Sequence, residues 1–381
     1  MRDASVGSAG SSGDIVDVDC LVVGAGVGGA LLGLLLGRRG QRVVVVEASP
    51  SLRTGGADFL KPRGLRLIRD HGLMADLRSR GSLERSVIDF YHDGTPILLY
   101  DFTEHTETGH FVIVPYVETV GAILSGCKDL PNVDVRFGSR VVDIVATDEA
   151  VTEAMLDDGT KLRARTFVDS TGRSPLHAFV DPRVKALAPY PHVLRMATTK
   201  LTSSVAERNR LYFSSDGWFA YFYPLTYDSA RLFVGVPREL DASVFESRDI
   251  DLTSHLESFV SDSRDVFPLI DAGAFLRAPI SAFTCEQYHR GNVILMGGGA
   301  FACHPMTGQG MSYTMEDATI LAGILAENDS GNLSRALGER YETRRSLHAE
   351  LVSYGDRLAR SYHDREAYQR VHHAGRHGGE L

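Results

Sequence analysis

Two glycine-rich segments contain the residues whose spacing suits cofactor binding. The first is Gly24-Ala25-Gly26-Val27-Gly28-Gly29, a GxGxxG pattern between an apolar run and a helical pattern. In such a turn Gly24 allows the tight bend, Gly26 lets a pyrophosphate approach the backbone, and Gly29 lets the helix pack closely on the strand. Glu47 follows about twenty residues later, where an acid can bind a ribose hydroxyl. The pattern predicts dinucleotide binding; the alternative is a turn that only packs a helix on a sheet.

A second glycine-rich segment lies near the other end of the chain. It follows an apolar run at 293–296 and precedes a helical pattern at 309–325. The segment reads Gly297-Gly298-Gly299-Ala300-Phe301-Ala302-Cys303-His304-Pro305-Met306-Thr307-Gly308-Gln309-Gly310-Met311, and Glu316-Asp317-Ala318 comes soon after it.

This second segment resembles the second FAD fingerprint of the single-component, class A flavin monooxygenases, which has the form GDxxHxxxPxxGxGxN followed by EDA. The resemblance implies that the strand end approaches the ribityl chain of FAD. It also implies a helix whose N-terminus points its amides at the pyrimidine edge of the flavin, where a positive helix end stabilises the anionic reduced form. The cofactor-binding residues implied here are Gly297, Gly298, Pro305, Gly308, Gly310 and Met311.

Other stretches extend the resemblance over most of the chain. A stretch of ubiquinone hydroxylases and squalene epoxidases is similar to Asp58-Phe59-Leu60-Lys61-Pro62-Arg63-Gly64. The sequence from His304 to Gly308 is similar to that of squalene epoxidases. Tyr341-Glu342-Thr343-Arg344-Arg345 resembles their C-terminal helix. Arg53 lies near the position where the family places an arginine beside the adenosine diphosphate moiety; a solvated loop arginine is the alternative.

Three residues depart from the family pattern at positions that contact FAD. Gly298 replaces an aspartate that binds the ribityl hydroxyls, and Tyr116 replaces an arginine found in many relatives. The third departure lies in the segment Asp169-Ser170-Thr171-Gly172-Arg173-Ser174, where Thr171 occupies an aspartate position. This segment is similar to the corresponding sequence of halogenase-like, epoxidase-like and reductase-like flavoproteins. Each lost hydrogen bond is worth about 0.5–1.5 kcal/mol. We therefore expect FAD to be held loosely at a site that includes Tyr116, Thr171 and Gly172.

Four side chains are candidates for contact with a substrate. His304 directly precedes Pro305, where it is expected to position a substrate or a peroxyflavin; capping a helix or packing in a wall is the alternative. Trp218, Tyr221 and Tyr223 lie in one aromatic strand pattern, which predicts the lining of an apolar pocket above the flavin. Ordinary core packing is the alternative for these three residues.

Hydrophobic periodicity indicates the elements that position these residues. A strand at 18–23, a helix at 28–39 and a β-branched strand at 43–46 form a βαβ unit. A hairpin at 87–100 turns on Asp93-Gly94, and alternating aromatic and aliphatic residues over 192–236 predict an antiparallel sheet. Helices are also expected from Pro62 through Gly81, after Pro115, at 309–325 and from Leu333 onward, and strands at 133–137, 141–146, 162–168 and 293–296.

These elements predict an α/β protein with a Rossmann-like FAD-binding domain, an inserted antiparallel β-sheet substrate domain and C-terminal helices. The FAD-binding domain is expected to comprise 17–86, 110–175 and 285–327, and the substrate domain 87–109 and 176–284. Residues 1–16 are expected to form a disordered tail and 328–381 C-terminal helices and a tail.

Composition limits the partners and the setting. The chain has 40 basic and 49 acidic residues and a net charge of −9, which argues against a nucleic-acid partner. Four scattered cysteines indicate neither a disulfide framework nor a zinc site and suit a reducing cytoplasm. The longest apolar stretch, 30–36, is far shorter than the roughly 20 residues that span a bilayer. No metal site is expected, because the histidines near the C-terminus have no carboxylates at ligand spacing.

The resemblance implies an FAD-dependent oxidoreductase that acts as a monooxygenase. FAD reduced by NAD(P)H, with a separate flavin reductase as a possible partner, is expected to react with oxygen to a C4a-hydroperoxyflavin that hydroxylates or epoxidises a small apolar or aromatic substrate. One alternative is an FAD-dependent dehydrogenase or isoprenoid-type reductase, and another is a halogenase-like enzyme. Halogenase is disfavoured because only the first tryptophan of the WxWxIP element is present, at Trp218. A degenerate flavoprotein acting as a non-redox cyclase or binding protein is the last alternative.

Overall fold

The computed structural model describes residues 15–52, 55, 57–182, 185–186, 188–328 and 331–376. Most of the expected tail, residues 1–14, lies outside this part of the chain. The assignment of Ile15 and Val16 to that tail is wrong, because they begin strand β1 (Ile15–Val23) and pair with β11 (Lys161–Asp169).

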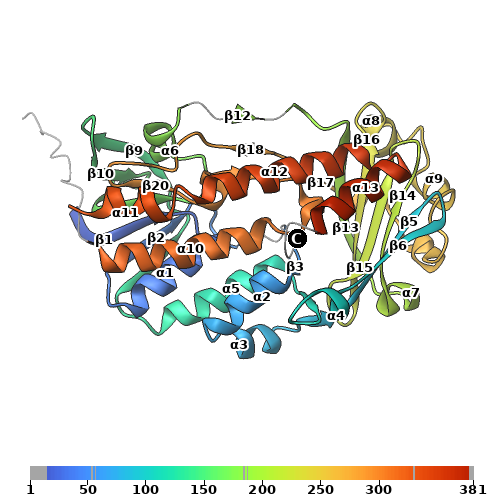
Figure 1. Ribbon diagram of the computed structural model, residues 1–381, viewed down its shortest axis with the longest axis horizontal. Helices are drawn as coiled ribbons and strands as arrows, with labels where there is room; N and C mark the ends of the chain where they lie inside the picture. Colours follow the sequence, from blue (N-terminus) through green and yellow to red (C-terminus); the bar gives the residue numbers. More distant parts are fainter. Residues whose placement is uncertain are drawn as a thin grey trace, which may run out of the picture.

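An eight-stranded sheet lies on the left of Figure 1, in the half of the molecule that the sequence predicts to bind FAD and that is called the cofactor half below. Its strands β20 (Val293–Leu295), β11, β1, β2 (Val43–Glu47) and β8 (Val133–Phe137) are all parallel. Val43 to Val46 are buried, as expected of a strand covered on both faces. Helix α1 (Val27–Arg38) connects β1 to β2 and packs against α5 (Tyr116–Lys128) and α10 (Gly310–Glu327). Dinucleotides bind at the carboxyl ends of the strands of such a sheet.

A seven-stranded sheet, in the order β17-β13-β16-β15-β14-β5-β6, forms the half that the sequence predicts to bind a substrate and that is called the substrate half below. All neighbouring strands pair antiparallel except β14 and β5. The hairpin turns on Asp93 (φ 46°) and Gly94 (φ 72°), the left-handed pair that an Asp-Gly sequence predicts. The strands are β5 (Val87–His92), β6 (Thr95–Asp101), β13 (His192–Lys200), β14 (Asn209–Phe213), β15 (Phe219–Pro224), β16 (Ser229–Pro237) and β17 (Leu276–Ala278).

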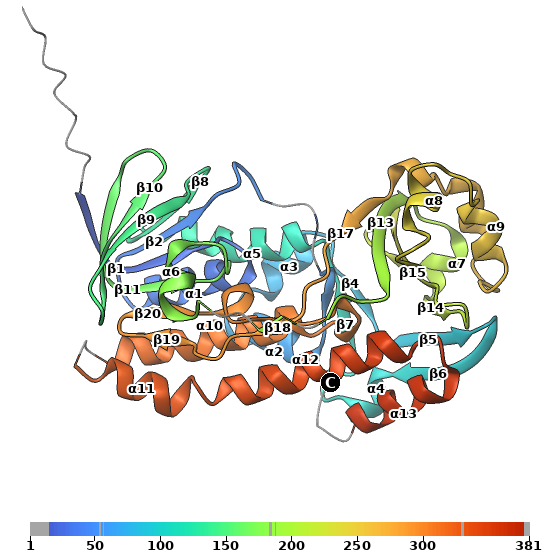
Figure 2. The same ribbon diagram turned by 90° about the horizontal axis from the view of Figure 1, so that it is seen from above.

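Different apolar layers cover the two faces of this sheet. One layer, which contains Trp218 and Phe222, packs beneath α8 (Asp241–Phe245) and α9 (Leu252–Glu257), and Figure 2 shows these helices on one side of β13 and β15. The other layer contains Phe219 and Tyr223. Successive side chains of a strand point to opposite faces, so Trp218 and Tyr223 lie on different sides of the sheet.

Helix α12 (Arg344–Ser361) runs alongside both halves in Figures 1 and 2. Its Leu351 and Val352 are buried in the cofactor-half core, whereas Tyr354 and Leu358 join the aromatic core of the substrate half. The small sheet β3-β7-β4, made of Phe59–Leu60, Phe111–Ile113 and Leu83–Arg85, lies in the same contact region. One helix and one small sheet therefore connect the two cores.

Two element predictions were incomplete. The helix expected from Pro62 through Gly81 is divided into α2 (Pro62–Asp70) and α3 (Met74–Ser79), because Gly72 adopts φ 73° and ends the first helix. Strand β10 (Val151–Leu156), which pairs with β9 (Val141–Ala146) and β11, was not expected. The α/β class with parallel and antiparallel sheets and C-terminal helices is confirmed. The exact domain limits stay a prediction.

The remaining elements are short or lie near the C-terminus. None of the helices among the described residues is long and apolar enough to cross a bilayer. These remaining elements are α4 (Phe102–His105), α6 (Pro175–Val180), α7 (Ser203–Glu207), α11 (Leu333–Arg340), α13 (Arg365–Arg376), β12 (Lys185–Ala186), β18 (Phe283–Thr284), β19 (His289–Arg290), β21 (Phe301–Ala302), and the 3-10 turns Arg264–Leu269, Ala272–Ala274, Gly297–Gly299 and Pro305–Thr307.

Candidate cofactor and substrate site

The glycine turn between β1 and α1 forms a cradle that side chains would fill. Gly24 has φ +102°, and a Cβ there would lie 2.6 Å from the methyl group of Thr171. A Cβ on Gly29 would overlap the carbonyl oxygen of Gly24. Gly26 N-caps α1 without a side-chain hydrogen bond, which leaves the first helical amides for other acceptors. These conformations are the ones that a dinucleotide-binding turn requires.

Two further predicted residues lie beside this turn. The carboxylate of Glu47, at the end of β2, accepts hydrogen bonds from Ala25 N at 3.2 Å and Ser49 N at 2.9 Å. The hydroxyl of Tyr116, at the start of α5, accepts one from Val27 N at 3.1 Å. The contact of Glu47 with a ribose stays a prediction. Arg53, the other residue expected near the adenosine end, lies outside the described residues.

The Asp169–Ser174 turn follows β11 and joins the two glycine segments. Buried Asp169 accepts hydrogen bonds from the backbone N of Thr171 at 2.6 Å and from its hydroxyl at 2.7 Å. Gly172 has φ +66°, and a Cβ there would lie 2.7 Å from the carbonyl oxygen of Gly298. The hydroxyl of Thr171 therefore stabilises the turn, and Gly172 allows the second glycine segment to approach it.

Gly297 and Gly298 follow β20 in a 3-10 turn at the same strand edge. Gly297 has φ +52°, and a Cβ there would lie 2.7 Å from the methyl group of Thr314. Gly298 is exposed and has no positive φ, and the nearest atom to an added Cβ would be the Ser170 carbonyl oxygen at 3.2 Å. Position 298 therefore accepts a side chain after a small local adjustment. Thr314 was not predicted from the sequence, because a threonine in a helix gives no signal of its own.

Residues 304–311 bend around a hollow at the start of α10. Pro305 begins a 3-10 turn, Gly308 (φ +59°) ends it, and Gly310 begins α10. Met311, in the first turn of α10, is buried. This arrangement places the N-terminus of an 18-residue helix at the edge of a hollow. The hollow has a volume of about 230 Å³ and is lined by Pro279, Ser281, Phe301, Ala302, Cys303, Pro305, Gly310 and Thr314.

Lys61 places a positive charge beside this loop. Its Nζ donates a hydrogen bond to the Thr307 carbonyl oxygen at 2.7 Å, and a Cβ on Gly308 would lie 3.0 Å from its Cε. Burial lowers the pKa of Lys61 to about 8, an effect that Cys303 opposes. Within the described part of the chain, no carboxylate forms an ion pair with Lys61. In the sequence, Lys61 was noted only as part of the Asp58–Gly64 stretch, and no role was predicted for it because its partner loop lies 246 residues away.

His304 is buried, and both of its ring nitrogens have partners. Its Nδ1 accepts a hydrogen bond from Met306 N at 3.2 Å, so the neutral ring carries its proton on Nε2. That Nε2 lies 2.9 Å from Nε2 of buried His192. Burial lowers the pKa of both rings, that of His192 to about 4. The ring therefore caps the 3-10 turn, which was the alternative to a catalytic role, and neither nitrogen is available to a substrate.

The three aromatic residues expected to line one pocket do not share a face of the sheet. Trp218 packs against His255 of α9 with tilted rings, 3.9 Å between ring centroids, in the layer beneath α9. Tyr221 and Tyr223 lie on the opposite face, where Phe59 stacks on Tyr221 at 5.5 Å. Trp218 is therefore a core residue, and its expected place in the pocket is wrong because side chains alternate along β15.

A buried ion pair connects these tyrosines to the cofactor half. Asp58, just before β3, accepts hydrogen bonds from Arg231 Nε and Tyr223 Oη, both at 3.0 Å, and from Tyr116 N at 3.2 Å. Arg231, on β16, also donates to Thr198 at 2.7 Å. Burial raises the pKa of Asp58, and the charge of Arg231 opposes the rise. The pair thus fixes the face of the sheet that carries Tyr221 and Tyr223, called the tyrosine face below, against the segment that leads into α2.

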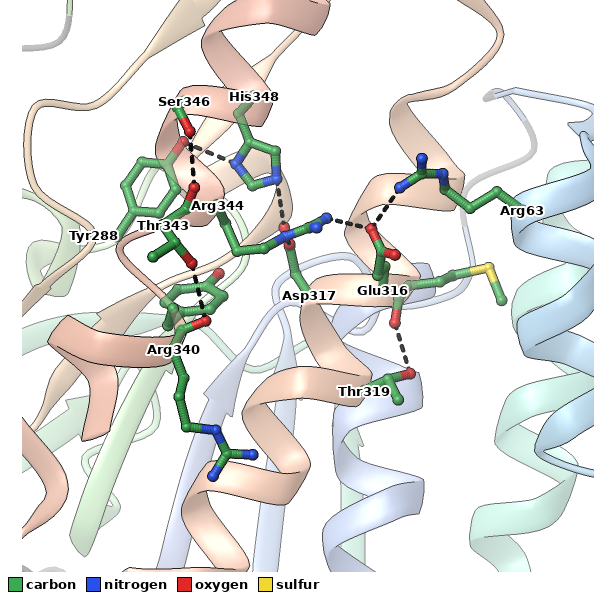
Figure 3. A network of polar contacts seen from close by, with 12 residues as sticks. Arg63, Tyr288, Glu316, Asp317, Thr319, Arg340, Thr343, Arg344, Ser346 and His348 are labelled. Carbon is green, nitrogen blue, oxygen red and sulfur yellow. Dashed lines mark hydrogen bonds and ion pairs between the residues drawn. The ribbon is translucent and has the colours of Figure 1, made fainter. Parts of the chain in front are cut away.

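Figure 3 shows how the Glu316-Asp317 pair meets Arg344, two motifs that the sequence analysis noted separately. Arg344 donates hydrogen bonds to Asp317 at 2.9 Å and to Glu316 at 2.5 Å, and Arg63 donates to Glu316 at 2.9 Å. His348 Nε2 lies 3.2 Å from Asp317. The network ties α10 to α2 and α12 and therefore holds the start of α10 beside the hollow.

Known proteins share both the motifs and the fold. A family model described as an FAD binding domain matches residues 17–354. The chain is 26% identical over 335 residues to the FAD-dependent monooxygenase atnJ of Arthrinium sp, which covers 82% of this chain and 77% of the relative. It is 25% identical over 346 residues to para-nitrophenol 4-monooxygenase of Pseudomonas sp. (strain WBC-3), with 87% and 84% covered.

A solved structure gives a longer match at higher identity. The crystal structure of P. aeruginosa PqsL in complex with 2-aminobenzoylacetate has a TM-score of 0.86 and 34% identity, and the match covers 94% of this chain and 100% of that chain. The glycine cradle, which added Cβ atoms would fill, fits the pyrophosphate of FAD. These relatives support a monooxygenase over the dehydrogenase, halogenase and non-redox alternatives. Because the family match spans nearly the whole described chain, this protein belongs to the FAD-dependent monooxygenases.

Proposed function

We propose that this monooxygenase hydroxylates a small aromatic compound, which binds between the tyrosine face of the seven-stranded sheet and the 304–311 loop. The observation that carries the proposal is the aromatic cluster on that face. Phe59 stacks on Tyr221 at 5.5 Å and meets Tyr223 edge-on at 4.8 Å, and Met306 of the loop packs into the same cluster. A flat aromatic ring suits such a surface through stacking and edge contacts.

The hydroxyl of Tyr221 offers this substrate a polar contact. Its oxygen is buried and has no hydrogen-bond partner among the described residues, whereas the neighbouring hydroxyl of Tyr223 donates to Asp58. Burial raises the pKa of Tyr221 well above its ordinary value, so the group stays protonated at neutral pH. An unpaired buried hydroxyl is costly. A phenol, amine or carboxylate substituent on the ring supplies the missing partner, and the complex of PqsL with 2-aminobenzoylacetate supports this class of ligand.

FAD, when bound, supplies the activation of oxygen and the transfer of one oxygen atom to the substrate. The residues of the chain provide the setting for that chemistry. Lys61 and the N-terminus of α10 place positive charge beside the hollow, which favours the anionic form of a reduced flavin ring there. Phe301 and Pro305 contribute apolar walls to the hollow and limit the access of water.

The proposed reaction requires two co-reactants. Molecular oxygen is the co-substrate, and NAD(P)H is the reductant, either directly or through a separate flavin reductase. All four cysteines are free, which suits a reducing compartment such as the cytoplasm.

The test supplies the protein with FAD, a chemical or enzymatic source of reduced flavin, and oxygen. Candidate substrates are aromatic amines, phenols and aromatic carboxylates, with aliphatic apolar compounds for comparison. We expect oxygen consumption stimulated by aromatic compounds and a product that has gained one oxygen atom, detected by mass spectrometry. If flavin binds but no aromatic compound yields an oxygenated product, the proposed function is wrong.

The variant Tyr221→Phe tests whether the substrate forms a hydrogen bond with this hydroxyl. Loss of one hydrogen bond worth about 0.5–1.5 kcal/mol should raise KM about 2- to 10-fold. Tyr227→Phe, at an exposed position, is the matched control and should leave KM unchanged. An unchanged KM in Tyr221→Phe would place the substrate elsewhere.

A further inference from the structure

Tyr116 occupies space that the glycine turn otherwise leaves open. Its hydroxyl oxygen accepts a hydrogen bond from Val27 N, the first amide of α1, at 3.1 Å. A Cβ on Gly26 would lie 3.0 Å from the same oxygen. Gly26 is the residue whose missing side chain lets a pyrophosphate reach the helix amides. The phenol oxygen therefore stands at the place where a phosphate oxygen is expected.

The backbone of Tyr116 is held in place, so the hydroxyl can leave this position only by rotation of the side chain. Its backbone N donates to the buried carboxylate of Asp58 at 3.2 Å, and Pro115 precedes it. The helix that it opens, α5, packs along α1 and contributes Val120 and Ile123 to the core.

We propose that the Tyr116 hydroxyl competes with the pyrophosphate of FAD for the N-terminus of α1, and that this competition sets how tightly the protein holds FAD. The hydroxyl is neutral, whereas the pyrophosphate is an anion, which the positive end of a helix attracts more strongly. FAD therefore displaces the hydroxyl, but each binding event includes loss of the hydrogen bond to Val27. The inference deepens the cofactor part of the function and does not depend on the aromatic substrate.

The first experiment compares wild type with Tyr116→Phe. Purified apoprotein is titrated with FAD, and binding is followed by the quenching of flavin fluorescence. Without the competing hydrogen bond, whose strength corresponds to a factor of about 2 to 10, the Kd for FAD should fall by that factor. Tyr227→Phe is the matched control and should leave the Kd unchanged. An unchanged or higher Kd in Tyr116→Phe would overturn the proposal; a higher value would mean that the hydroxyl binds FAD directly.

A ligand series separates the competition from a general effect on the fold. ADP carries the pyrophosphate without the flavin ring, and riboflavin carries the ring without phosphate. Binding of ADP to Tyr116→Phe, measured by calorimetry, should strengthen by the same factor as binding of FAD, whereas riboflavin should show no change. Equal strengthening of riboflavin, or none for ADP, would contradict competition at the helix end.

Thermal unfolding provides a second measurement on the same proteins. The apo form of Tyr116→Phe should melt below wild type, because Val27 N loses its acceptor. Saturating FAD should then raise the melting temperature more in the variant than in wild type. A smaller rise in the variant would count against the proposal.

Discussion

The two halves of the molecule form their parts of the proposed site from different groups. In the cofactor half, the surface is shaped by backbone, because Gly24, Gly29 and Gly172 each lie where a Cβ would meet a neighbouring atom. In the substrate half, side chains form the surface, with Tyr221 against Phe59. Binding at a surface formed by backbone should be lost when side-chain atoms are added, whereas binding at a surface formed by side chains should weaken when their atoms are removed.

Side chains also contribute to the junction between the two halves. Besides helix α12 and the small sheet, Asp58, which lies just before β3, forms a buried ion pair with Arg231 of the substrate half, so the junction also includes two charged side chains. Substitutions that add or remove atoms test this contrast, and the largest effect is expected from atoms added to the backbone site.

Gly26→Val adds atoms to the backbone site and should abolish FAD binding. The new side chain would fill the space between the start of α1 and Tyr116. The extended conformation of Gly26 (φ −69°) suits any residue, so the fold should remain intact. Titration with FAD measures binding, and circular dichroism checks the fold. Gly338→Val is the control, since a Cβ there meets no atom within 4 Å. Full flavin binding by Gly26→Val would show that the cradle has been misidentified.

Asp58→Ala removes atoms from the junction and should lower the free energy of unfolding by about 3–5 kcal/mol, because Arg231 would remain buried without its partner. Urea denaturation measures the change. Asp134→Ala, which breaks the exposed pair with Arg136, is the matched control and should cost less than about 1 kcal/mol. A loss of similar size in both variants would mean that the buried pair has no special role at the junction.

Acid should weaken the fold through the His192–His304 pair. Burial, with smaller contributions from Arg238 and Arg360, lowers the pKa of His192 from 6.5 to about 4. Between these values the unfolded chain binds a proton that the folded protein excludes, so stability falls as the pH falls from 6.5 to 4, by about 3 kcal/mol for His192 alone.

Urea denaturation across this pH range measures the effect. His192→Gln should flatten the profile, whereas His363→Gln, at an exposed position, should leave it unchanged. A wild-type profile that is flat between pH 4 and 6.5 would rule out a neutral buried pair.

Gly298→Asp should have the smallest effect, because it adds a side chain at the one exposed glycine of the 297–299 turn. Its Cβ would lie 3.2 Å from the Ser170 carbonyl oxygen and has no backbone strain to overcome. The new carboxylate should restore a hydrogen bond to the ribityl hydroxyls and tighten FAD about 2- to 10-fold. Fluorescence titration measures the change. Weaker binding or a lower melting temperature would show that the turn has no room for the side chain.

The sequence alone determined the features that depend on neighbours along the chain. The GxGxxG turn, the valines of β2 and the Asp-Gly hairpin were all predicted, because a few adjacent residues decide backbone conformation and burial there. The family resemblance supplied the expectation that residues 297–311 bind FAD, and this expectation stays a prediction. Where a single glycine changes the backbone direction, as Gly72 does, the prediction of one continuous helix failed.

Only the tertiary structure decided which distant residues meet. The hydroxyl of Tyr116 reaches an amide 89 residues away, Lys61 reaches a carbonyl 246 residues away, and His304 meets His192 across 112 residues. The face on which Trp218 lies was also undecided, because the alternation of side chains along a strand is visible in sequence but the partner of each face is not. Such contacts depend on how the two sheets pack, and no local pattern of residues encodes that packing.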